Sequence, residues 1–215
     1  MPMNLSALLL HGMGRTPLSM VWLARRLRTA NIDARCFGYS VTFERFAACQ
    51  ARLRARIAAM KTPYVLIGHS LGTVLIRSVL PELTAPPLTC FLLTPPTVVC
   101  RLARRFAPHL PYRWLAGEMG QLLADPTFMA ALPIPSMPTT VYVGARGWRG
   151  RFSPFGDEAN DVILSVTETL LPETPPNIRR VEIRAAHSFI MNHKEVVGDI
   201  IKEINKSDLP QNSKT

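Results

Sequence analysis

The sequence predicts an α/β fold in which a mostly parallel central sheet of about six strands is flanked by helices. Short apolar segments alternate along the chain with longer segments of helical periodicity, which is typical of parallel strands joined by helical crossovers. With 215 residues, 47% of them hydrophobic, the chain is long enough for one well-buried domain and short for two. We therefore expect one domain over residues 1–205 and a disordered polar tail over residues 206–215.

The strands and helices follow one another in a regular order. Strands are predicted at residues 6–10, 33–39, 64–67, 88–93, 139–143 and 178–183, and the first of them is expected to be buried. Helices are predicted from periodicity at residues 17–30, 43–60, 71–80 and 189–204. Pro17 suits the first turn of a helix, whereas Pro63 and Pro81 end the helices before them. The strand over residues 64–67 is expected at the centre of the sheet.

Residues 95–138 interrupt this order between the fourth and fifth strands. The segment is rich in proline and carries bulky side chains that look exposed, such as Phe106, Trp114 and Met129. A connection of this length is uncommon in a compact domain unless it has a function. We interpret it as a helical cap over a site; the alternative is a helical excursion that only completes the core.

The pentapeptide Gly68-His-Ser-Leu-Gly72 lies between a predicted strand and a predicted helix. In a G-x-S-x-G turn at such a junction the serine is held in a strained conformation with its hydroxyl above the sheet. The glycines allow the strand and the helix to approach closely. Ser70 is therefore the predicted nucleophile. The alternative is that the glycines are ordinary turn residues and Ser70 caps the helix.

A serine nucleophile needs a base, and in this fold the acid and then the histidine follow the serine in the chain. The sequence has five histidines. His11 and His69 precede the serine, and His109 lies in the insert. His187 follows the last strand, at the edge of the sheet toward which the serine points, and is the predicted base. His193 is interpreted as a residue on the face of the last helix.

The acid must orient that histidine, and three aspartates lie between the serine and the base. Asp125 is in the insert. Asp161 follows the fifth strand and precedes an apolar stretch that can fasten it beneath the histidine, so it is the predicted acid. Asp157, in the same loop, is the alternative; either would otherwise be a helix N-cap. Glu158 and Glu168 are weaker candidates.

Acyl transfer also needs donors aimed at the developing oxyanion. One is expected to be the backbone N–H of Leu71, the residue after the nucleophile. The other is expected in the loop after the first strand, Leu10-His-Gly-Met-Gly14, whose glycines let an amide turn inward. We predict the N–H of Met13. No metal site and no cofactor are predicted.

These segments resemble the α/β-hydrolase superfamily, and more narrowly its small lipase-like and esterase members. The matching residues are L-L-L-H-G-M-G (8–14), Y-V-L-I-G-H-S-L-G (64–72), N-D-V-I-L-S-V-T-E-T (160–169) and A-H-S-F-I-M (186–191). The resemblance covers the chain to residue 204 and implies a trimmed hydrolase fold that begins at the family's third strand.

By this resemblance Ser70 is the nucleophile, Asp161 the acid and His187 the base. Similar proteins often carry Asn-Asp-Gly at the acid, whereas Val162 stands at the glycine position here. That departure keeps Asp157 open as the acid.

Composition and charge bear on partners and compartment. The formal net charge of +10 is carried mostly by arginine and favours anionic surfaces, so weak peripheral contact with an anionic membrane is expected. Nucleic acid is not favoured, because aromatic residues are not interleaved with the basic ones. The four cysteines are widely spaced and suggest neither a zinc site nor a disulfide framework. We recognise no signal peptide and no membrane span, and expect a cytoplasmic setting.

The combined pattern predicts a serine hydrolase that cleaves small-molecule carboxylic esters through an acyl-enzyme on Ser70. The bulky apolar residues of the insert suggest that the ester carries an acyl chain. Thioester hydrolysis or acyl transfer is the alternative, because the same residues support both and the fold does not fix the substrate. A third reading is a non-catalytic lipid-binding or scaffold protein.

Overall fold

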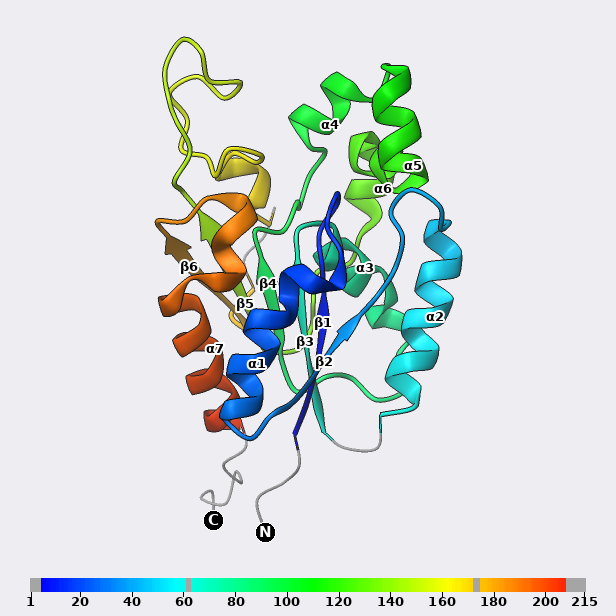
Figure 1. Ribbon diagram of the computed structural model, residues 1–215, viewed down its shortest axis with the longest axis vertical. Helices are drawn as coiled ribbons and strands as arrows, with labels where there is room; N and C mark the ends of the chain where they lie inside the picture. Colours follow the sequence, from blue (N-terminus) through cyan, green and yellow to red (C-terminus); the bar gives the residue numbers. More distant parts are fainter. Residues whose placement is uncertain (1–4, 61–62, 172–174, 208–215) are drawn as a thin grey trace.

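The computed structural model describes residues 5–60, 63–171 and 175–207. Within them, six strands form one sheet in the order β2-β1-β3-β4-β5-β6, and every pairing is parallel, which confirms the predicted α/β fold (Figure 1). The strands are β1 (Ser6–Leu10), β2 (Asp33–Phe37), β3 (Tyr64–His69), β4 (Cys90–Leu93), β5 (Thr139–Gly144) and β6 (Ile178–Ile183). The strand that ends at the pentapeptide is β3, in the interior of the sheet.

Helices cover both faces of the sheet (Figure 1). The flanking helices are α1 (Val21–Thr29) and α7 (Lys194–Ser207) on one face, and α2 (Phe46–Ala58) and α3 (Leu71–Val79) on the other. Successive side chains of a strand point to opposite faces. In β1, Leu8 and Leu10 therefore join the core under α2 and α3, whereas Ala7 and Leu9 join the core under α1 and α7. The sheet thus has two hydrophobic cores, one on each face.

Short 3-10 helices complete the connections: η1 (Pro17–Met20), η2 (Leu80–Glu82), η3 (Thr167–Thr169) and η4 (His187–Asn192). The last of them corrects the prediction of one helix over residues 189–204, because α7 begins only at Lys194. The N–H of His187 donates to the carbonyl oxygen of Asp161 at 2.8 Å, and the extended backbone of His193 (φ −71°, ψ 129°) separates η4 from α7. The predicted tail from residue 206 starts inside α7, and residues 208–215 lie outside the described residues.

The insert between β4 and β5 forms three helices above the carboxyl ends of the strands (Figure 1). They are α4 (Arg101–Phe106), α5 (Leu110–Ala124) and α6 (Pro126–Ala131). Met129 is buried against the core under α2 and α3, although the sequence suggested exposure, whereas Trp114 is exposed as expected. Met119 is buried in the same core. The insert therefore completes one core with its inner side and presents apolar residues on its outer side.

Two attachments hold the insert on the domain. Helix α5 is kinked at Gly117, whose φ of 55° and position against the carbonyl oxygen of Val41, 2.7 Å from where a Cβ would stand, leave no room for a side chain. On α3, the buried Arg77 donates to the carbonyl oxygens of Leu132 and Pro133. Burial lowers the pKa of Arg77 to about 10. Among the described residues, no helix combines the length and apolar character needed to cross a bilayer.

Candidate active site

Ser70 lies in a strained turn between β3 and α3. Its φ of 51° and ψ of −119° are outside the regions that a residue with a side chain prefers, a strain that costs on the order of 1–3 kcal/mol. A Cβ on Gly68 would stand 2.9 Å from the backbone of Gly72, and one on Gly72 would stand 2.7 Å from the carbonyl oxygen of Leu10. The Ser70 side chain makes no capping hydrogen bond to α3. This geometry is that of a nucleophile elbow and differs from a simple helix cap.

The loop after β5 brings Asp161 to His187. The Nδ1 of His187 lies 2.7 Å from Oδ2 of Asp161, and both side chains are buried. The other carboxylate oxygen, Oδ1, accepts from the backbone N–H groups of Ile163 (3.0 Å) and Leu164 (2.7 Å). Three donors thus fix a fully buried carboxylate. Asp157, the alternative acid, is exposed in the same loop and has no contact with His187.

Val162 explains why glycine suits the position after the acid. Its φ is 89°, in the left-handed region that is unfavourable for a β-branched residue. The N–H of Val162 donates to Oδ1 of Asn160 at 3.0 Å. The carboxamide of Asn160 in turn donates to the carbonyl oxygen of Trp148. The valine at this position therefore leaves the geometry of the acid intact, with its strain held by neighbouring hydrogen bonds.

Ser70 and His187 share the wall of one pocket of about 290 Å³ beneath the insert. Most of its lining is apolar and comes from the first part of the insert and from the acid loop: Cys100, Leu102, Ala103, Phe106, Tyr112, Leu123, Ile163 and Leu164. Within the described residues the Ser70 hydroxyl has no hydrogen bond to the His187 ring. In unliganded sites this contact often tightens only when substrate binds.

The backbone N–H groups of Leu71 and Met13 are the predicted donors to an oxyanion. Neither the N–H of Leu71 nor that of Met13 donates to another group among the described residues. Met13 also lines the pocket. A Cβ on Gly12 would stand 3.0 Å from Cβ of Ser70 and 2.7 Å from Nδ1 of His69, so only glycine lets this loop come so close. Both predicted donors thus belong to segments in contact with the serine.

His69, which sequence reasoning set aside, contacts the backbone of His187, the predicted base. Its Nε2 lies 2.9 Å from the carbonyl oxygen of His187. Burial, with His187 nearby, holds the pKa of His69 well below its ordinary value. The ring is therefore neutral, with Nε2–H as the donor. His11 stacks on Tyr39 with ring centroids 4.1 Å apart, and burial lowers its pKa too.

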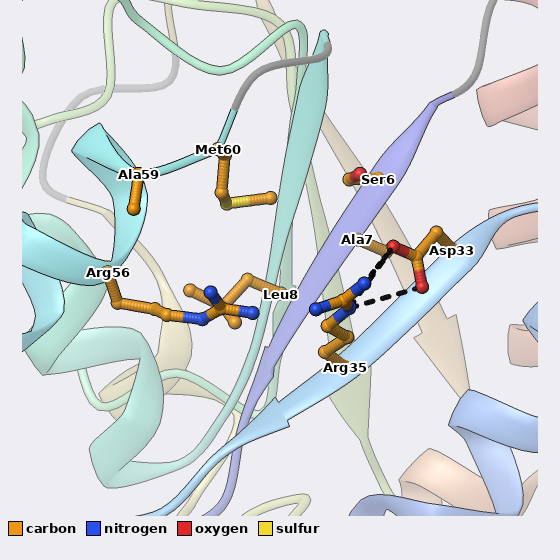
Figure 2. A pocket seen from close by; sticks show the side chains of 8 residues that line it. All are labelled: Ser6, Ala7, Leu8, Asp33, Arg35, Arg56, Ala59 and Met60. Carbon is orange, nitrogen blue, oxygen red and sulfur yellow. Dashed lines mark hydrogen bonds and ion pairs between the residues drawn. The ribbon is translucent and has the colours of Figure 1, made fainter.

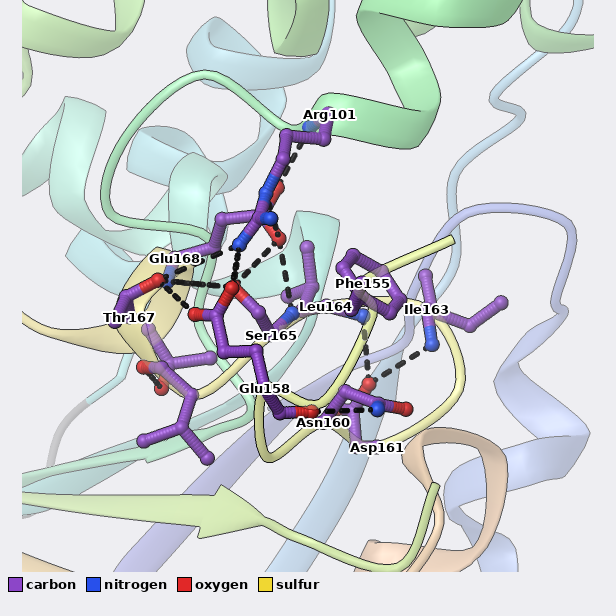
Figure 3. Close-up of polar contacts among 12 residues, drawn as sticks. Arg101, Phe155, Glu158, Asn160, Asp161, Ile163, Leu164, Ser165, Thr167 and Glu168 are labelled. Atoms are coloured by element: carbon purple, nitrogen blue, oxygen red, sulfur yellow. Dashed lines mark hydrogen bonds and ion pairs between the residues drawn. The ribbon is translucent and has the colours of Figure 1, made fainter. Parts of the chain in front are cut away.

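A cluster of charged residues missed by sequence reasoning ties the acid loop to the insert (Figure 3). Glu168 is buried, and its carboxylate accepts from the N–H of Arg101 at 2.6 Å and from the N–H and hydroxyl of Ser165 at 2.9 Å each. The Arg101 guanidinium also reaches Glu158 and Ser165, both at 2.5 Å, and lies over the ring of Phe155. The two glutamates that were weaker candidates for the acid are thus engaged with Arg101, away from His187.

A local signal could have revealed part of this cluster. The sequence from Ser165 to Glu168 reads S-V-T-E, the pattern of a capping box, in which serine and glutamate each bind the backbone N–H of the other. Both bonds are present: Ser165 N–H to Glu168, and Glu168 N–H to the Ser165 hydroxyl at 3.3 Å. The partnership with Arg101, at the start of α4, has no local signal.

Other sites of the described chain lack comparable chemistry. A second pocket, of about 180 Å³, lies between β1, β2 and the end of α2 and is lined in part by Asp33, Arg35 and Arg56 (Figure 2). Asp33 and Arg35 form an ion pair there, at the amino ends of the strands and thus at the opposite edge of the sheet from Ser70. No group of three or more His, Cys, Asp or Glu side chains in the described residues is arranged to hold a metal ion.

Comparisons with known proteins agree with this geometry. A family model described as the alpha/beta hydrolase family matches residues 7–198. No curated protein matches the sequence.

Solved structures share the fold at low sequence identity. A pyrethroid hydrolase from Sphingobium faniae JZ-2 has a TM-score of 0.59 at 11% identity, covering 96% of this chain and 99% of that one. MenH from S. aureus has a TM-score of 0.62 at 12% identity, covering 96% of each chain. A structure from work on carboxylesterases of the thaumarchaeon Nitrososphaera gargenis has a TM-score of 0.63 at 10% identity, covering 95% of this chain and 91% of that one. These likenesses concern the fold. Because the family model spans most of the sequence, the chain belongs to the alpha/beta hydrolase family.

Proposed function

We propose that the protein is a serine hydrolase that cleaves carboxylic esters through an acyl-enzyme on Ser70. The observation that carries the proposal is the buried Asp161–His187 pair, 2.7 Å apart, in the same pocket as a serine held at a positive φ. Burying a carboxylate and holding a serine at a positive φ both cost free energy, so finding them together in one pocket favours a catalytic role. The family supplies the general class of chemistry, and the site supplies the residues.

In the proposed reaction His187 accepts the Ser70 proton at Nε2 as the serine oxygen attacks the ester carbonyl carbon. The N–H groups of Met13 and Leu71 stabilise the resulting oxyanion, each contributing on the order of 10²–10³ in rate. His187 then gives its proton to the leaving alcohol, and the acyl group stays on Ser70. Water, deprotonated by the same ring, hydrolyses the acyl-enzyme. The products are a carboxylic acid and an alcohol.

The pocket supports an ester with an apolar acyl group. Its lining from α4, α5 and the acid loop is almost entirely apolar, and burial of an acyl chain there gains about 0.8 kcal/mol for each methylene group removed from water. Among the structurally similar proteins, one is named as a pyrethroid hydrolase and another comes from work on carboxylesterases. Thioester hydrolysis and acyl transfer differ from this proposal only in the leaving group or the acceptor.

A fluorophosphonate probe tests the nucleophile. We expect the wild type to be labelled and Ser70→Ala to be unlabelled, with His187→Ala labelled far more slowly. Ser188→Ala is the matched control, because Ser188 lines the same pocket outside the elbow; it should be labelled like the wild type. Labelling of Ser70→Ala, or none of the wild type, would contradict the proposal. A chain-length series of p-nitrophenyl esters and the corresponding thioesters then measures the preference for acyl group and leaving group.

A further inference from the structure

The exposed large apolar side chains are concentrated at one end of the molecule. Among the described residues with such side chains, Leu88 lies directly before the amino end of a strand. All the others lie in the insert or in the loops, 3-10 helices and first helical turns that come after the carboxyl end of a strand. In a parallel sheet these segments meet at one edge. Scattered exposed apolar residues are normal in any protein, but their confinement to the end that carries the pocket is not what chance exposure produces.

Two segments project at this end, on either side of the molecule in Figure 1. One is residues 101–115 of the insert, with Leu110 (75% exposed) and Trp114 (72%). The other is residues 145–155 of the loop after β5, with Trp148 (53%) and Phe152 (88%). We call the exposed side chains of these two segments the docking face. Its most prominent apolar residues include two of the three tryptophans of the chain.

The docking face is also strongly basic. Residues 101–115 contain four arginines and residues 145–155 contain three, and neither segment contains an aspartate or glutamate. Of these arginines only Arg101 forms an ion pair among the described residues. At the base of the second segment, Arg146, Arg149 and Arg184 line an open pocket of about 570 Å³ with one carboxylate, Glu182. Such a pocket suits the phosphate of a headgroup.

We propose that the docking face binds an anionic phospholipid bilayer. Tryptophan is favoured at the boundary between headgroups and acyl chains, and each arginine near an anionic bilayer surface adds attraction. The insert contributes both to the docking face and to the wall of the Ser70 pocket. If the proposed function holds, docking presents that pocket to esters carried by the membrane. A protein partner or a second copy of the chain is the competing occupant, and the experiment separates them.

The first arm measures binding without turnover, by co-sedimentation of full-length Ser70→Ala with vesicles. We expect binding to phosphatidylcholine vesicles containing about one third phosphatidylglycerol, little binding to phosphatidylcholine alone, and a loss at high salt. Arg149→Gln/Arg151→Gln should weaken binding to the anionic vesicles about 30-fold, the loss expected for two basic residues at such a surface. Arg25→Gln/Arg26→Gln, which removes the same charge from exposed positions on α1, should bind like the parent.

The second arm tests the apolar side chains. Trp148→Ser/Phe152→Ser should weaken vesicle binding, and Leu88→Ser, at the other end of the sheet, should not. Brominated phospholipids should quench Trp148 and Trp114 more than Trp22 in single-tryptophan variants.

Equal binding by the Arg149/Arg151 variant and its control would overturn the proposal, as would no preference for anionic vesicles. A dimer in sedimentation equilibrium that these substitutions dissociate would reassign the face to protein contact. Every binding arm uses Ser70→Ala, so the vesicle-binding results do not depend on whether the esterase proposal is correct.

Discussion

Replacing Asp161 by asparagine removes one charge and one acceptor from a site that is otherwise packed. The carboxylate receives three hydrogen bonds, two from backbone N–H groups at Oδ1 and one from Nδ1 of His187 at Oδ2. An asparagine side chain has one oxygen to accept them and an NH₂ group that only donates. If the oxygen faced His187, the NH₂ group would oppose two backbone donors, each left unpaired at about 1–3 kcal/mol. The oxygen therefore takes the backbone side, and the NH₂ group faces Nδ1.

That orientation forces the wrong tautomer on the base. With a donor opposite it, Nδ1 of His187 must accept, so the ring proton moves to Nε2, the nitrogen that has to accept the Ser70 proton. We expect Asp161→Asn to lower kcat by about 10³–10⁴, equivalent to a barrier higher by about 4–5.5 kcal/mol. The protein should remain folded, because the substitution preserves shape and the two backbone hydrogen bonds.

The assay is the hydrolysis of a short p-nitrophenyl ester, with the melting temperature measured in parallel. Asp157→Asn is the matched control: it makes the same substitution at the exposed aspartate four positions earlier and should leave kcat unchanged. Loss of activity in Asp157→Asn with retention in Asp161→Asn would contradict the assignment of Asp161 as the acid. So would retention in both variants, because neither aspartate would then be needed to orient His187.

Three further predictions concern stability and positioning. Gly72→Ala should lower the free energy of unfolding by about 1–3 kcal/mol, because the added Cβ meets backbone that cannot move aside; Gly198→Ala, in open space on α7, should instead raise it by about 0.5–1 kcal/mol in chemical denaturation. Glu168→Gln should lower kcat with a smaller change in KM, and should lower the free energy of unfolding by about 2 kcal/mol because its hydrogen bonds are weakened. Glu182→Gln, in an exposed ion pair, should change neither kcat nor the free energy of unfolding. Because the pKa of His69 is depressed in the folded protein, the unfolded chain takes up a proton on this side chain as pH falls below the ordinary histidine pKa, whereas the folded protein does not. The free energy of unfolding therefore decreases as pH falls. The melting temperature should therefore drop on acidification, and less steeply in His69→Gln. The same slope of melting temperature against pH in both proteins would contradict the assignment of a neutral, buried His69.

Local sequence patterns were sufficient to predict the fold class and the succession of strands and helices. The strands β1, β3 and β4 consist almost entirely of apolar residues, whereas the edge strands β2 and β6 combine charged and apolar residues. Most connecting segments have helical periodicity, so the succession of strands and helices along the chain, and with it a parallel sheet, follows from neighbouring residues. The elbow is equally local, since Gly68 and Gly72 are required by contacts within a single turn and its neighbouring strand. His187 was predicted as the base from its place after the last strand. The last helix begins later than predicted because the backbone of His193, between η4 and α7, is extended.

Which aspartate contacts His187 was decided only by the tertiary structure. Asp157 and Asp161 lie in one loop. The apolar stretch after Asp161 favoured it but left Asp157 open as the residue that contacts His187, 26 residues after Asp161. The hydrogen bonds of Ile163 and Leu164 turn one carboxylate inward and leave the other in solvent. The same holds for Arg101 and Glu168, 67 residues apart, and for the division of the insert into a buried side and an exposed side. Sequence determines which groups are available, because each residue type carries its own chemistry. Only the folded chain determines which of them meet, because their contacts depend on backbone geometry set elsewhere in the domain.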